Sequence, residues 1–406
     1  MMQLPDAPWL HDPAFERVVD ALRVDGQPPR IVGGAVRDAL LGIAVADVDI
    51  ATPLVPDEVT RRLEAARIKA VPTGIDHGTV TAVADGRTFE ITTLRRDVST
   101  DGRRATVEFA TDWKEDAARR DFTINALYAD PESREIFDYF DGLADLAAHH
   151  IGFIGDAEAR IAEDHLRILR LFRFHARFGK GAIDAEALAA ASTHASKLMA
   201  LSRERISDEL RKLLSVANPA PAVQAMLDNG IFASFLPEIV ADAGNKLAML
   251  IERETASAIK PSAGRRLSAI LPVDTAGVEK IASRMKLSNR LRTDLVQLAA
   301  HRGSIQSARQ LAYAIGTENA RDLVLLDFDD NRLRQELASI ESWQVPQLPV
   351  KGGDLIAKGL RAGPVVAKTL QAIERQWVAE AFPEEPRATE IADQMVAEAL
   401  REGGNP

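Results

Sequence analysis

The first 150 residues of the chain consist of short runs in which apolar and polar residues alternate. The runs "TVTAVA" (79–84) and "TFEITTL" (88–94) place every second side chain on one face, which predicts two β-strands. The "DGR" between them predicts a hairpin turn. Runs with helical spacing, such as "PDEVTRRLEAARI" (56–68), stand between the strands. The pattern predicts a mixed sheet with helices.

The pattern changes after residue 155 to long amphipathic stretches rich in Ala, Leu, Arg and Glu. Strands are scarcely visible from there to the end, which predicts an all-α region. Segments that contain proline and glycine, such as "VANPAPAVQAM" and "VPQLPVKGGD", mark helix boundaries or joints between subdomains. The fold class expected is therefore an α+β head followed by a helical body.

The amino-acid composition limits the kinds of functional site that the chain can form. The chain has 406 residues, a net charge of −10 and no cysteine, so disulfides and thiolate sites are excluded and any metal must be held by oxygen or imidazole. The start "MMQLPDAPWLHDP" does not resemble a signal peptide, and no stretch approaches the length of a membrane span, so we expect a cytoplasmic protein without a membrane partner. Residues 160–180 nevertheless hold six basic and two acidic side chains, so the overall charge conceals a positive segment.

Two aspartates stand in the apolar run "DVDIAT". In an extended strand Asp47 and Asp49 share one face, while Val48 and Ile50 point to the other. Two carboxylates about 4 Å apart repel by roughly 4 kcal/mol at an effective dielectric near 20, so a cation is needed between them. Oxygen ligands of this kind favour Mg²⁺, and Glu90 has the parity to be a third carboxylate. Alone, the motif is more typical of a solvated turn or strand edge.

A glycine pair precedes these aspartates. Gly33 and Gly34 follow a short apolar strand and lead into a helix that carries Arg37 in its first turn. Free backbone N–H groups and a guanidinium at such a turn can bind phosphate oxygens. The alternative is a tight turn that needs glycine for a positive φ. Next to an Asp-x-Asp motif, a triphosphate site is the better interpretation.

The segment "RIAEDHLRILRLFRFHARFG" predicts a helix with a cationic face. Four arginines fall within an arc of about 120°, and apolar residues fill much of the remainder: Arg167, Arg170, Arg173 and Arg177 against Ile168, Leu169, Leu171, Phe172 and Ala176. Like charges at these spacings suggest an anionic ligand or an acidic partner surface.

Two acid–base pairs could contact a nucleotide. Asp164 precedes Arg167 by three residues, so that an acceptor and a donor could read the edge of a nucleobase, although such a pair is commonly only an exposed helical ion pair. Arg120 and Asp121 form a second pair, in which Asp121 could instead cap a helix. The polar segment between residues 95 and 110 could be a mobile loop over the site or an exposed linker.

Taken together and in this order, "GGAVRDALLG" with "DVDIAT", "FEITTLRRD", "RRDFTINAL", "FDGLADL" and "EDHLRILRLFRFHARFG" closely resemble the class II tRNA nucleotidyltransferase and bacterial poly(A) polymerase family. The head of that family resembles DNA polymerase beta. The motifs span about residues 30–180, and "LSRERISDELRKLL" looks like the family's RNA-binding neck. The resemblance implies a nucleotidyltransferase head over 1–155, a helical neck for nucleobase selection and RNA binding over 156–240, and a tRNA-binding body and tail over 241–406.

The resemblance also implies a reaction and its residues. It implies template-independent addition of CCA to tRNA 3′ ends from CTP and ATP by two-metal phosphoryl transfer, with pyrophosphate released. The tRNA 3′ end and acceptor arm are the expected partners, and DNA is not. Asp47 and Asp49 would bind Mg²⁺, with Glu90 as the weaker third carboxylate. The nucleotide-binding set would comprise Gly33, Gly34, Arg37, Arg120, Asp121, Asp164, Arg167, Arg170 and Arg173, with Asp164 and Arg167 as an amino-acid template for the base.

One departure and several alternatives accompany this interpretation. Gly152 stands where many relatives have an arginine, so any contribution from that position is in doubt. No second His-Asp phosphohydrolase pattern is visible in the body. A poly(A) polymerase and an enzyme that adds only CC or only the terminal A remain open, although the basic segment 95–110 favours full CCA addition by analogy. A catalytically silent RNA-binding protein is the alternative of another class.

Overall fold

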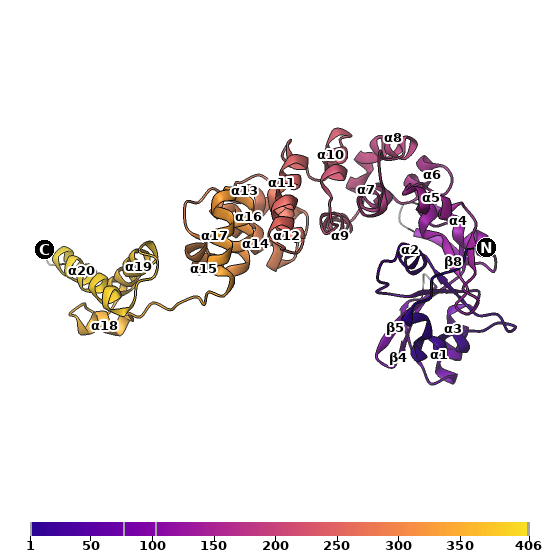
Figure 1. The fold of residues 1–406 in the computed structure, drawn as a ribbon, viewed down its shortest axis with the longest axis horizontal. Coiled ribbons are helices and arrows are strands. Elements are labelled where there is room, and N and C mark those ends of the chain that lie inside the picture. The colour runs from indigo at the N-terminus through magenta and orange to yellow at the C-terminus, as the bar shows by residue number, and fades with distance from the viewer. Residues whose placement is uncertain (1, 76–77, 102–103, 404–406) are drawn as a thin grey trace. The chain divides into compact units, whose positions relative to one another are not determined.

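The computed structural model describes residues 2–75, 78–101 and 104–403. The chain divides into two compact units, Met1–Gly244 and Asn245–Pro406, each with its own packing. The division into head, neck and body at residues 155 and 240 remains a prediction. Figure 1 shows the labelled strands in the N-terminal unit and helices in both units.

The N-terminal unit begins with a mixed sheet of seven strands in the order β3-β4-β5-β2-β1-β8-β9. The strand β2 runs parallel to β5, whereas each of the other neighbouring pairs is antiparallel. The strands are β1 (Arg30–Val32), β2 (Asp49–Thr52), β3 (Lys69–Gly74), β4 (Thr79–Ala84), β5 (Arg87–Thr93), β8 (Leu127–Ala129) and β9 (Ile136–Asp138). The predicted mixed sheet is confirmed.

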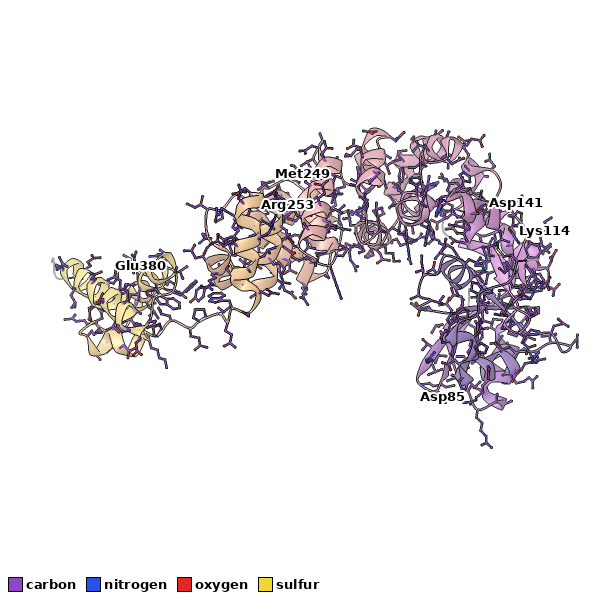
Figure 2. The ribbon with its side chains drawn as sticks, in the orientation of Figure 1. Asp85, Lys114, Asp141, Met249, Arg253 and Glu380 are labelled. Carbon is purple, nitrogen blue, oxygen red and sulfur yellow. The ribbon has the colours of Figure 1, made fainter. Side chains whose placement is uncertain are left out.

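The predicted hairpin is formed by β4 and β5. Their pairing runs to Ala84 opposite Arg87, and the turn residues Asp85 and Gly86 have φ values of 49° and 79°. Such a turn needs two positive φ angles, which Asp-Gly adopts at low cost. Asp85 is labelled in Figure 2. The hairpin brings Glu90 into register with β2.

Helices cover the sheet and lead out of it. They are α1 (Pro13–Ala21), α2 (Gly34–Leu40), α3 (Pro56–Ala65), α4 (Trp113–Ala118) and α5 (Gly142–Ala148). Both α1 and α3 pack against β4 (Figure 1). Residues 95–101 and 104–109 do not form a loop or a linker: they pair as a second, two-stranded sheet of β6 (Arg95–Asp101) and β7 (Arg104–Phe109), and residues 102–103 lie outside the described residues. The expectation of a loop is wrong because paired strands satisfy the backbone of this polar segment.

Five helices complete the N-terminal unit: α6 (Ala157–Glu163), α7 (Leu166–Phe178), α8 (Ala185–His194), α9 (Arg203–Leu214) and α10 (Ala220–Asp228). The helix α7 packs against α9 and α10 with its apolar face. Ile168, Leu169, Leu171 and Phe172 are buried, as predicted. The segment from Arg160 is not one helix, however, because the backbone at Asp164 is extended (φ −147°, ψ 103°) and separates α6 from α7.

The C-terminal unit is helical throughout the described residues, as the periodicity predicts. Its helices are α11 (Ala243–Ala256), α12 (Ala263–Ile270), α13 (Thr275–Arg284), α14 (Asn289–His301), α15 (Ala308–Ile315), α16 (Thr317–Asp327), α17 (Asp330–Glu341), α18 (Gly352–Ala357), α19 (Pro364–Ala379) and α20 (Glu385–Gly403). Leu355, Ile373, Trp377 and Ile391 form part of a core between the last three. Within residues 2–75, 78–101 and 104–403, no helix is long and apolar enough to cross a membrane.

Candidate functional site

A cavity of about 480 Å³ lies within the N-terminal unit, between residues of the sheet region and the helix α7. Nine of the twelve predicted site residues line it: Gly33, Gly34, Arg37, Asp49, Arg120, Asp121, Asp164, Arg167 and Arg170. The lining holds six arginines and three aspartates, in a chain whose net charge is −10. The cavity is therefore a positive site in an acidic protein, which suits an anionic ligand.

Two of the three predicted metal-binding carboxylates are neighbours at the start of β2. Asp49 is the first residue of β2 and pairs directly with Glu90 across the parallel strands. The prediction that Asp47 lies in the strand is wrong: it lies in the preceding loop, because the pairing of β2 with β5 begins at Asp49 and its pairing with β1 begins at Ile50. The alternation persists through the loop, where Asp47 is exposed and Val48 is buried.

Negative charge is concentrated at Asp49. Burial raises the pKa of Asp49 to about 6, and the charges of Glu90 and Asp47 add to the effect, while Arg120 opposes it. The donors are all hard oxygens, so the residues fit a hard divalent cation that would relieve this repulsion. In the described part of the chain, no group of three or more His, Asp or Glu has the arrangement of a metal site. Glu90 as a third ligand therefore stays a prediction.

The glycine pair forms the turn between β1 and α2. Gly33 has a φ of 69°, which explains the need for glycine at this position. A Cβ on Gly33 would lie 3.4 Å from Nη1 of Arg120, so the bare backbone also lets that guanidinium approach closely. The conformational and the ligand-binding interpretations of the pair are compatible.

Arg37 lies almost completely buried beneath the turn. Its Nε donates to Oδ1 of Asp38 at 2.8 Å, and its Nη1 donates to Oδ1 of Asn125. The guanidinium carbon lies 4.2 Å from the centroid of the Phe178 ring on α7. Burial lowers the pKa of Arg37, and the carboxylate of Asp38 offsets part of that effect. The side chain is thus held rigidly at one wall of the cavity.

Arg119 and Arg120 share one buried carboxylate. Asp116, which is 1% exposed, accepts from Nε of Arg119 at 2.8 Å and from Nη2 of Arg120 at 3.1 Å. Arg120 also donates to the hydroxyl of Tyr128 at 3.2 Å. Burial lowers the pKa of Arg120, but Tyr128 and Asp116 outweigh it and raise the pKa overall. Arg120 is therefore always charged, and its side chain lines the cavity.

Asp121 joins the sheet region to α7. One carboxylate oxygen accepts from Nδ2 of Asn125, and the other accepts from Nε of Arg170 at 2.7 Å. Burial raises the pKa of Asp121, but Arg170 and Asn125 outweigh it, so the pKa lies below its usual value. The short 3₁₀ helix that follows has Phe122 as its N-cap, so Asp121 is not a helix cap.

The predicted base-reading pair lies where α6 ends and α7 begins. Asp164 accepts from the backbone N–H of Leu166 at 3.1 Å and from Nη2 of Arg205 at 2.7 Å. Arg167 does not pair with Asp164: its Nη1 donates to Oε2 of Glu163 at 2.5 Å. Both side chains line the cavity, but each is bonded to another side chain of the protein and not to the other.

The remaining arginines of α7 have acidic partners inside the unit. Arg173 donates from Nε to Oε2 of Glu209 on α9 at 2.6 Å, and Arg177 lies 3.4 Å from Oδ2 of Asp38. Arg173 does not line the cavity, and its role in nucleotide binding stays a prediction. The acidic partner surface expected for the cationic face is thus partly supplied by the protein itself.

The structure shows which side chains surround Gly152, the position that departs from the family pattern. A Cβ on Gly152 would lie 3.0 Å from Cε1 of His150, whose ring occupies the adjoining space. His150 contacts Asp145 through Nδ1 at 2.9 Å and Asp184 through Nε2 at 3.3 Å. His150 therefore links α5 to the start of α8 from a position two residues before Gly152.

Five of the residues that line the cavity were not predicted from the sequence: Arg119, Asn125, Leu166, Phe174 and Arg205. Arg119 and Asn125 lie inside the quoted motif "ARRDFTINAL", so attention to its remaining polar residues could have found them. Arg205 lies in the separate segment "LSRERISDELRKLL", where no local signal connects it with Asp164.

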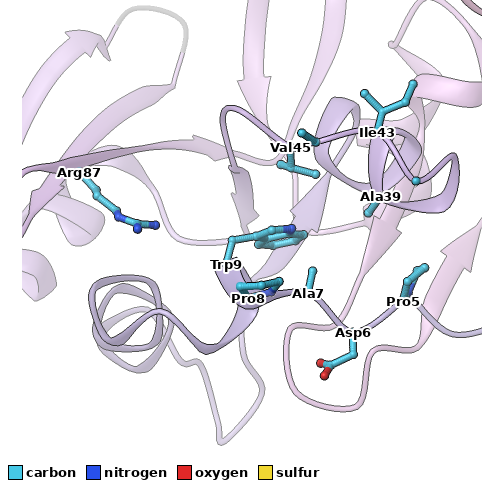
Figure 3. A pocket seen from close by; sticks show the side chains of 11 residues that line it. Pro5, Asp6, Ala7, Pro8, Trp9, Ala39, Ile43, Val45 and Arg87 are labelled. Carbon is cyan, nitrogen blue, oxygen red and sulfur yellow. The ribbon is translucent and has the colours of Figure 1, made fainter.

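A second hollow of about 600 Å³ lies beside the loop that precedes Asp47. Figure 3 shows Trp9, Ile43 and Val45 among its largely apolar lining, with Arg87 at one side. None of the predicted nucleotide-binding residues lines it. Its chemistry does not suit a polyphosphate.

Comparisons with known proteins agree with the geometry. Residues 29–152 match the family model described as the poly A polymerase head domain, and residues 182–242 match the one described as the probable RNA and SrmB-binding site of polymerase A. The crystal structure of the Bacillus stearothermophilus CCA-adding enzyme in complex with CTP is 28% identical, with a TM-score of 0.77, and covers 97% of this chain and 100% of that one. The fold is thus a polymerase-beta-like nucleotidyltransferase head followed by helices.

Relatives in sequence span most of the chain. The mitochondrial CCA tRNA nucleotidyltransferase 1 of Mus musculus is 33% identical over 93% of this chain and 88% of that protein. The CCA-adding enzyme of Lacticaseibacillus paracasei is 31% identical over 94% of this chain and 98% of that protein. The chain therefore belongs to the tRNA nucleotidyltransferase and poly(A) polymerase family, as its motifs predict. Enzymes of this family are generally metal-dependent.

Neutralising Asp49 should stabilise the metal-free protein. The folded-state pKa of Asp49, about 6, exceeds the ordinary value of 3.8, so the fold favours the protonated carboxyl. The resulting contribution to stability is fully present below pH 3.8 and is lost as the pH rises through 6. We expect Asp49→Asn to raise the free energy of unfolding at pH 7.5 by up to about 3 kcal/mol in the presence of a chelator. Urea denaturation at pH 7.5 and pH 4 tests this. A variant less stable than the wild type at pH 7.5 would contradict the raised pKa of Asp49.

His150 should make stability depend on pH above neutrality. The hydrogen bond with Asp145 raises the pKa of His150 above 6.5, burial opposes this, and Asp184 adds to the rise. The contribution of the ion pairs is fully present below pH 6.5 and is lost as the pH rises through the folded-state pKa. We expect the wild type to lose more stability than His150→Gln between pH 6.5 and pH 8.5, measured by urea denaturation. Parallel pH profiles for the two proteins would contradict the prediction.

Proposed function

We propose that this chain adds CCA to the 3′ ends of tRNA from CTP and ATP, without a nucleic-acid template, and releases pyrophosphate. The observation that carries the proposal is the arginine-rich cavity, in which Asp49, the Gly33–Gly34 turn and the pair Asp164 and Arg167 are brought together. Relatives named as CCA-adding enzymes, one of them in complex with CTP, support the same reaction.

The chain's own side chains would bind and orient the nucleotide. Arg37 and the Gly33–Gly34 turn would hold the triphosphate, and Arg120 and Asp121 would contact the incoming nucleotide. The 3′-hydroxyl of the RNA would attack the α-phosphorus, with pyrophosphate as the leaving group. Because Arg37 and Arg120 are fixed by buried partners before the ligand arrives, little reorganisation is needed at the moment of reaction.

The carboxylates would hold the metal. Asp47 and Asp49 are the proposed ligands of Mg²⁺, with Glu90 as the weaker third carboxylate. Burial raises the pKa of Asp49, and the negative charges of Glu90 and Asp47 add to the rise, which supports this assignment. When bound, Mg²⁺ stabilises the negative charge that develops on the reacting phosphate oxygens.

Asp164 and Arg167 would read the base. The carboxylate of Asp164 accepts from an exocyclic amino group, and the guanidinium of Arg167 donates to a ring nitrogen or carbonyl. Cytosine and adenine both carry an amino group at the corresponding edge. Arg170 and Arg173 would add contacts to the nucleotide or its phosphates.

The RNA partner would be the 3′ end and acceptor arm of tRNA. The match of residues 182–242 to a probable RNA-binding segment supports a neck that binds RNA, and we propose the body for further tRNA contacts. We further propose a cytoplasmic location, which the bacterial relatives favour. Because other relatives are named as mitochondrial, cell fractionation tests this location.

The reaction is tested by offering the purified protein a tRNA transcript that lacks CCA, with Mg²⁺ and each nucleotide separately and together. We expect three added residues that require both CTP and ATP. Long A tails would indicate a poly(A) polymerase, and addition of only CC or only A would indicate a partial enzyme. No extension under any combination would favour a non-catalytic RNA-binding protein.

The metal assignment is tested by Asp47→Ala and Asp49→Ala. We expect both to reduce extension at least about 10³-fold, since each removes a ligand that stabilises the transition state, and to leave tRNA binding largely intact in a gel-shift assay. Asp57→Ala, at an exposed position in the first turn of α3, is the matched control. Extension retained by the two site variants would refute the assignment.

The base-reading role is tested by Arg167→Ala. We expect the preference for CTP and ATP over UTP and GTP to fall by about tenfold or more, because one of the two base contacts is lost. Steady-state kinetics with each nucleotide measures the change. An unaltered preference would refute the role of Arg167 as part of the template.

A further inference from the structure

An arginine from α9 reaches the cavity and holds the proposed base-reading carboxylate. Arg205 lines the cavity, and its Nη2 donates to Oδ2 of Asp164 at 2.7 Å. The other oxygen of Asp164 accepts the backbone N–H of Leu166 at 3.1 Å. Each carboxylate oxygen therefore has one partner in the protein, and the carboxylate cannot rotate freely.

This contact contributes little to holding α9 in place. The side chains of Arg205 and Asp164 are 36% and 31% exposed, and ion pairs with that exposure stabilise a fold only weakly. The helix is already fixed by the ion pair between Arg173 and the buried Glu209, and by buried apolar residues such as Ile206 and Leu210. The contact between Arg205 and Asp164 is therefore better explained by what it does to the cavity.

The effect on the cavity follows from the acceptor capacity of a carboxylate. An ionised Asp offers about four lone-pair directions and no hydrogen to donate. With Arg205 on Oδ2 and the N–H of Leu166 on Oδ1, the lone pairs that remain are few and fixed in direction. A base must place its donor along one of these directions in order to bind.

We propose that Arg205 is a specificity-determining residue, which by fixing the carboxylate of Asp164 restricts the cavity to bases whose edge presents an amino group. This inference rests on the proposed function and assigns a residue outside the Asp164 and Arg167 pair. Cytosine and adenine offer an amino donor at that edge, whereas uracil and guanine offer a carbonyl oxygen there and a ring N–H beside it. A carboxylate released from Arg205 can turn to accept that ring N–H instead.

The inference also connects base selection with the RNA-binding segment. Arg205 belongs to residues 182–242, the segment that matches the RNA-binding family model, whereas Asp164 does not. A shift of α9 would be transmitted to the carboxylate through a single charge-assisted hydrogen bond. RNA bound by this segment could in this way alter which base is accepted.

The test compares three variants of the full chain on a tRNA that lacks CCA. Arg205→Ala removes the contact, Arg205→Lys keeps the charge, and Arg211→Ala is the matched control. Arg211 lies on the exposed side of the same helix, 3.6 Å from Asp208. The kcat and KM for CTP, ATP, UTP and GTP are measured separately, together with the thermal unfolding midpoint.

We expect Arg205→Ala to lower the ratio of kcat/KM for CTP to that for UTP by about tenfold, the scale of one good base contact. Arg205→Lys should restore part of the ratio, because an ammonium can still donate to Oδ2. Arg211→Ala should leave the ratio unchanged, and none of the three should shift the unfolding midpoint appreciably.

Two outcomes would overturn the inference. An unchanged ratio in Arg205→Ala would show that Arg205 does not determine specificity, and an equal loss for all four nucleotides would show a merely structural role. If the wild type adds nothing to tRNA, the proposed function fails, but calorimetric titration of wild type and Arg205→Ala with CTP and UTP still tests the inference. Equal affinity ratios in the two proteins would then overturn it.

Discussion

A closed ring of hydrogen bonds and ion pairs between α7 and the sheet region is the constraint on which the cavity depends. Two arginines one heptad apart on α7 each bind a carboxylate of the head, and Asn125 and Arg37 connect those carboxylates. The ring comprises Arg170, Asp121, Asn125, Arg37, Asp38 and Arg177. Asp121 and Arg37 are buried, so loss of one partner would leave an uncompensated charge, which is far more costly than the loss of an exposed pair.

Acidic partners explain how one helix carries four arginines on a single face. Each guanidinium has an acidic partner from a different part of the N-terminal unit: Arg167 with Glu163, Arg170 with Asp121, Arg173 with Glu209 and Arg177 with Asp38. The repulsion expected along the helix is offset residue by residue. The partners also fix the rotamers of the arginines, so those at the cavity wall are oriented before any ligand binds.

The fold was predictable from the sequence where local pattern determines it. Alternating runs around Asp-Gly define the hairpin of β4 and β5, and parity alone places Glu90 on the face it occupies opposite Asp49. Pattern could not reveal that β2 begins at Asp49, because that depends on where its pairing with β5 starts. It could not reveal the extended backbone at Asp164 either, since its neighbours on both sides have helical periodicity.

The candidate site was predictable where its residues share a motif and not where they meet only in space. Arg205 joins Asp164 across 41 residues, and Glu209 joins Arg173 across 36, through the packing of α9 on α7. Such contacts depend on helix packing, which no local spacing encodes. Gly152 illustrates the reverse: the sequence suggested a missing arginine, and the neighbouring His150 contacts Asp145 from a position that the motif does not include.

The distribution of charge along the cavity defines the class of ligand more sharply than any single residue. Asp49 lies at one edge, where burial and the charges of Glu90 and Asp47 raise its pKa and Arg120 lowers it. Arg37, Arg120 and Arg170 also line the cavity, and Asp164 lies among the lining arginines of α7 and α9. A ligand that matches this arrangement of charges must bring a cation to Asp49, anionic groups to the arginines and a hydrogen-bond donor to Asp164. A nucleoside triphosphate with its metal has those three features in one molecule.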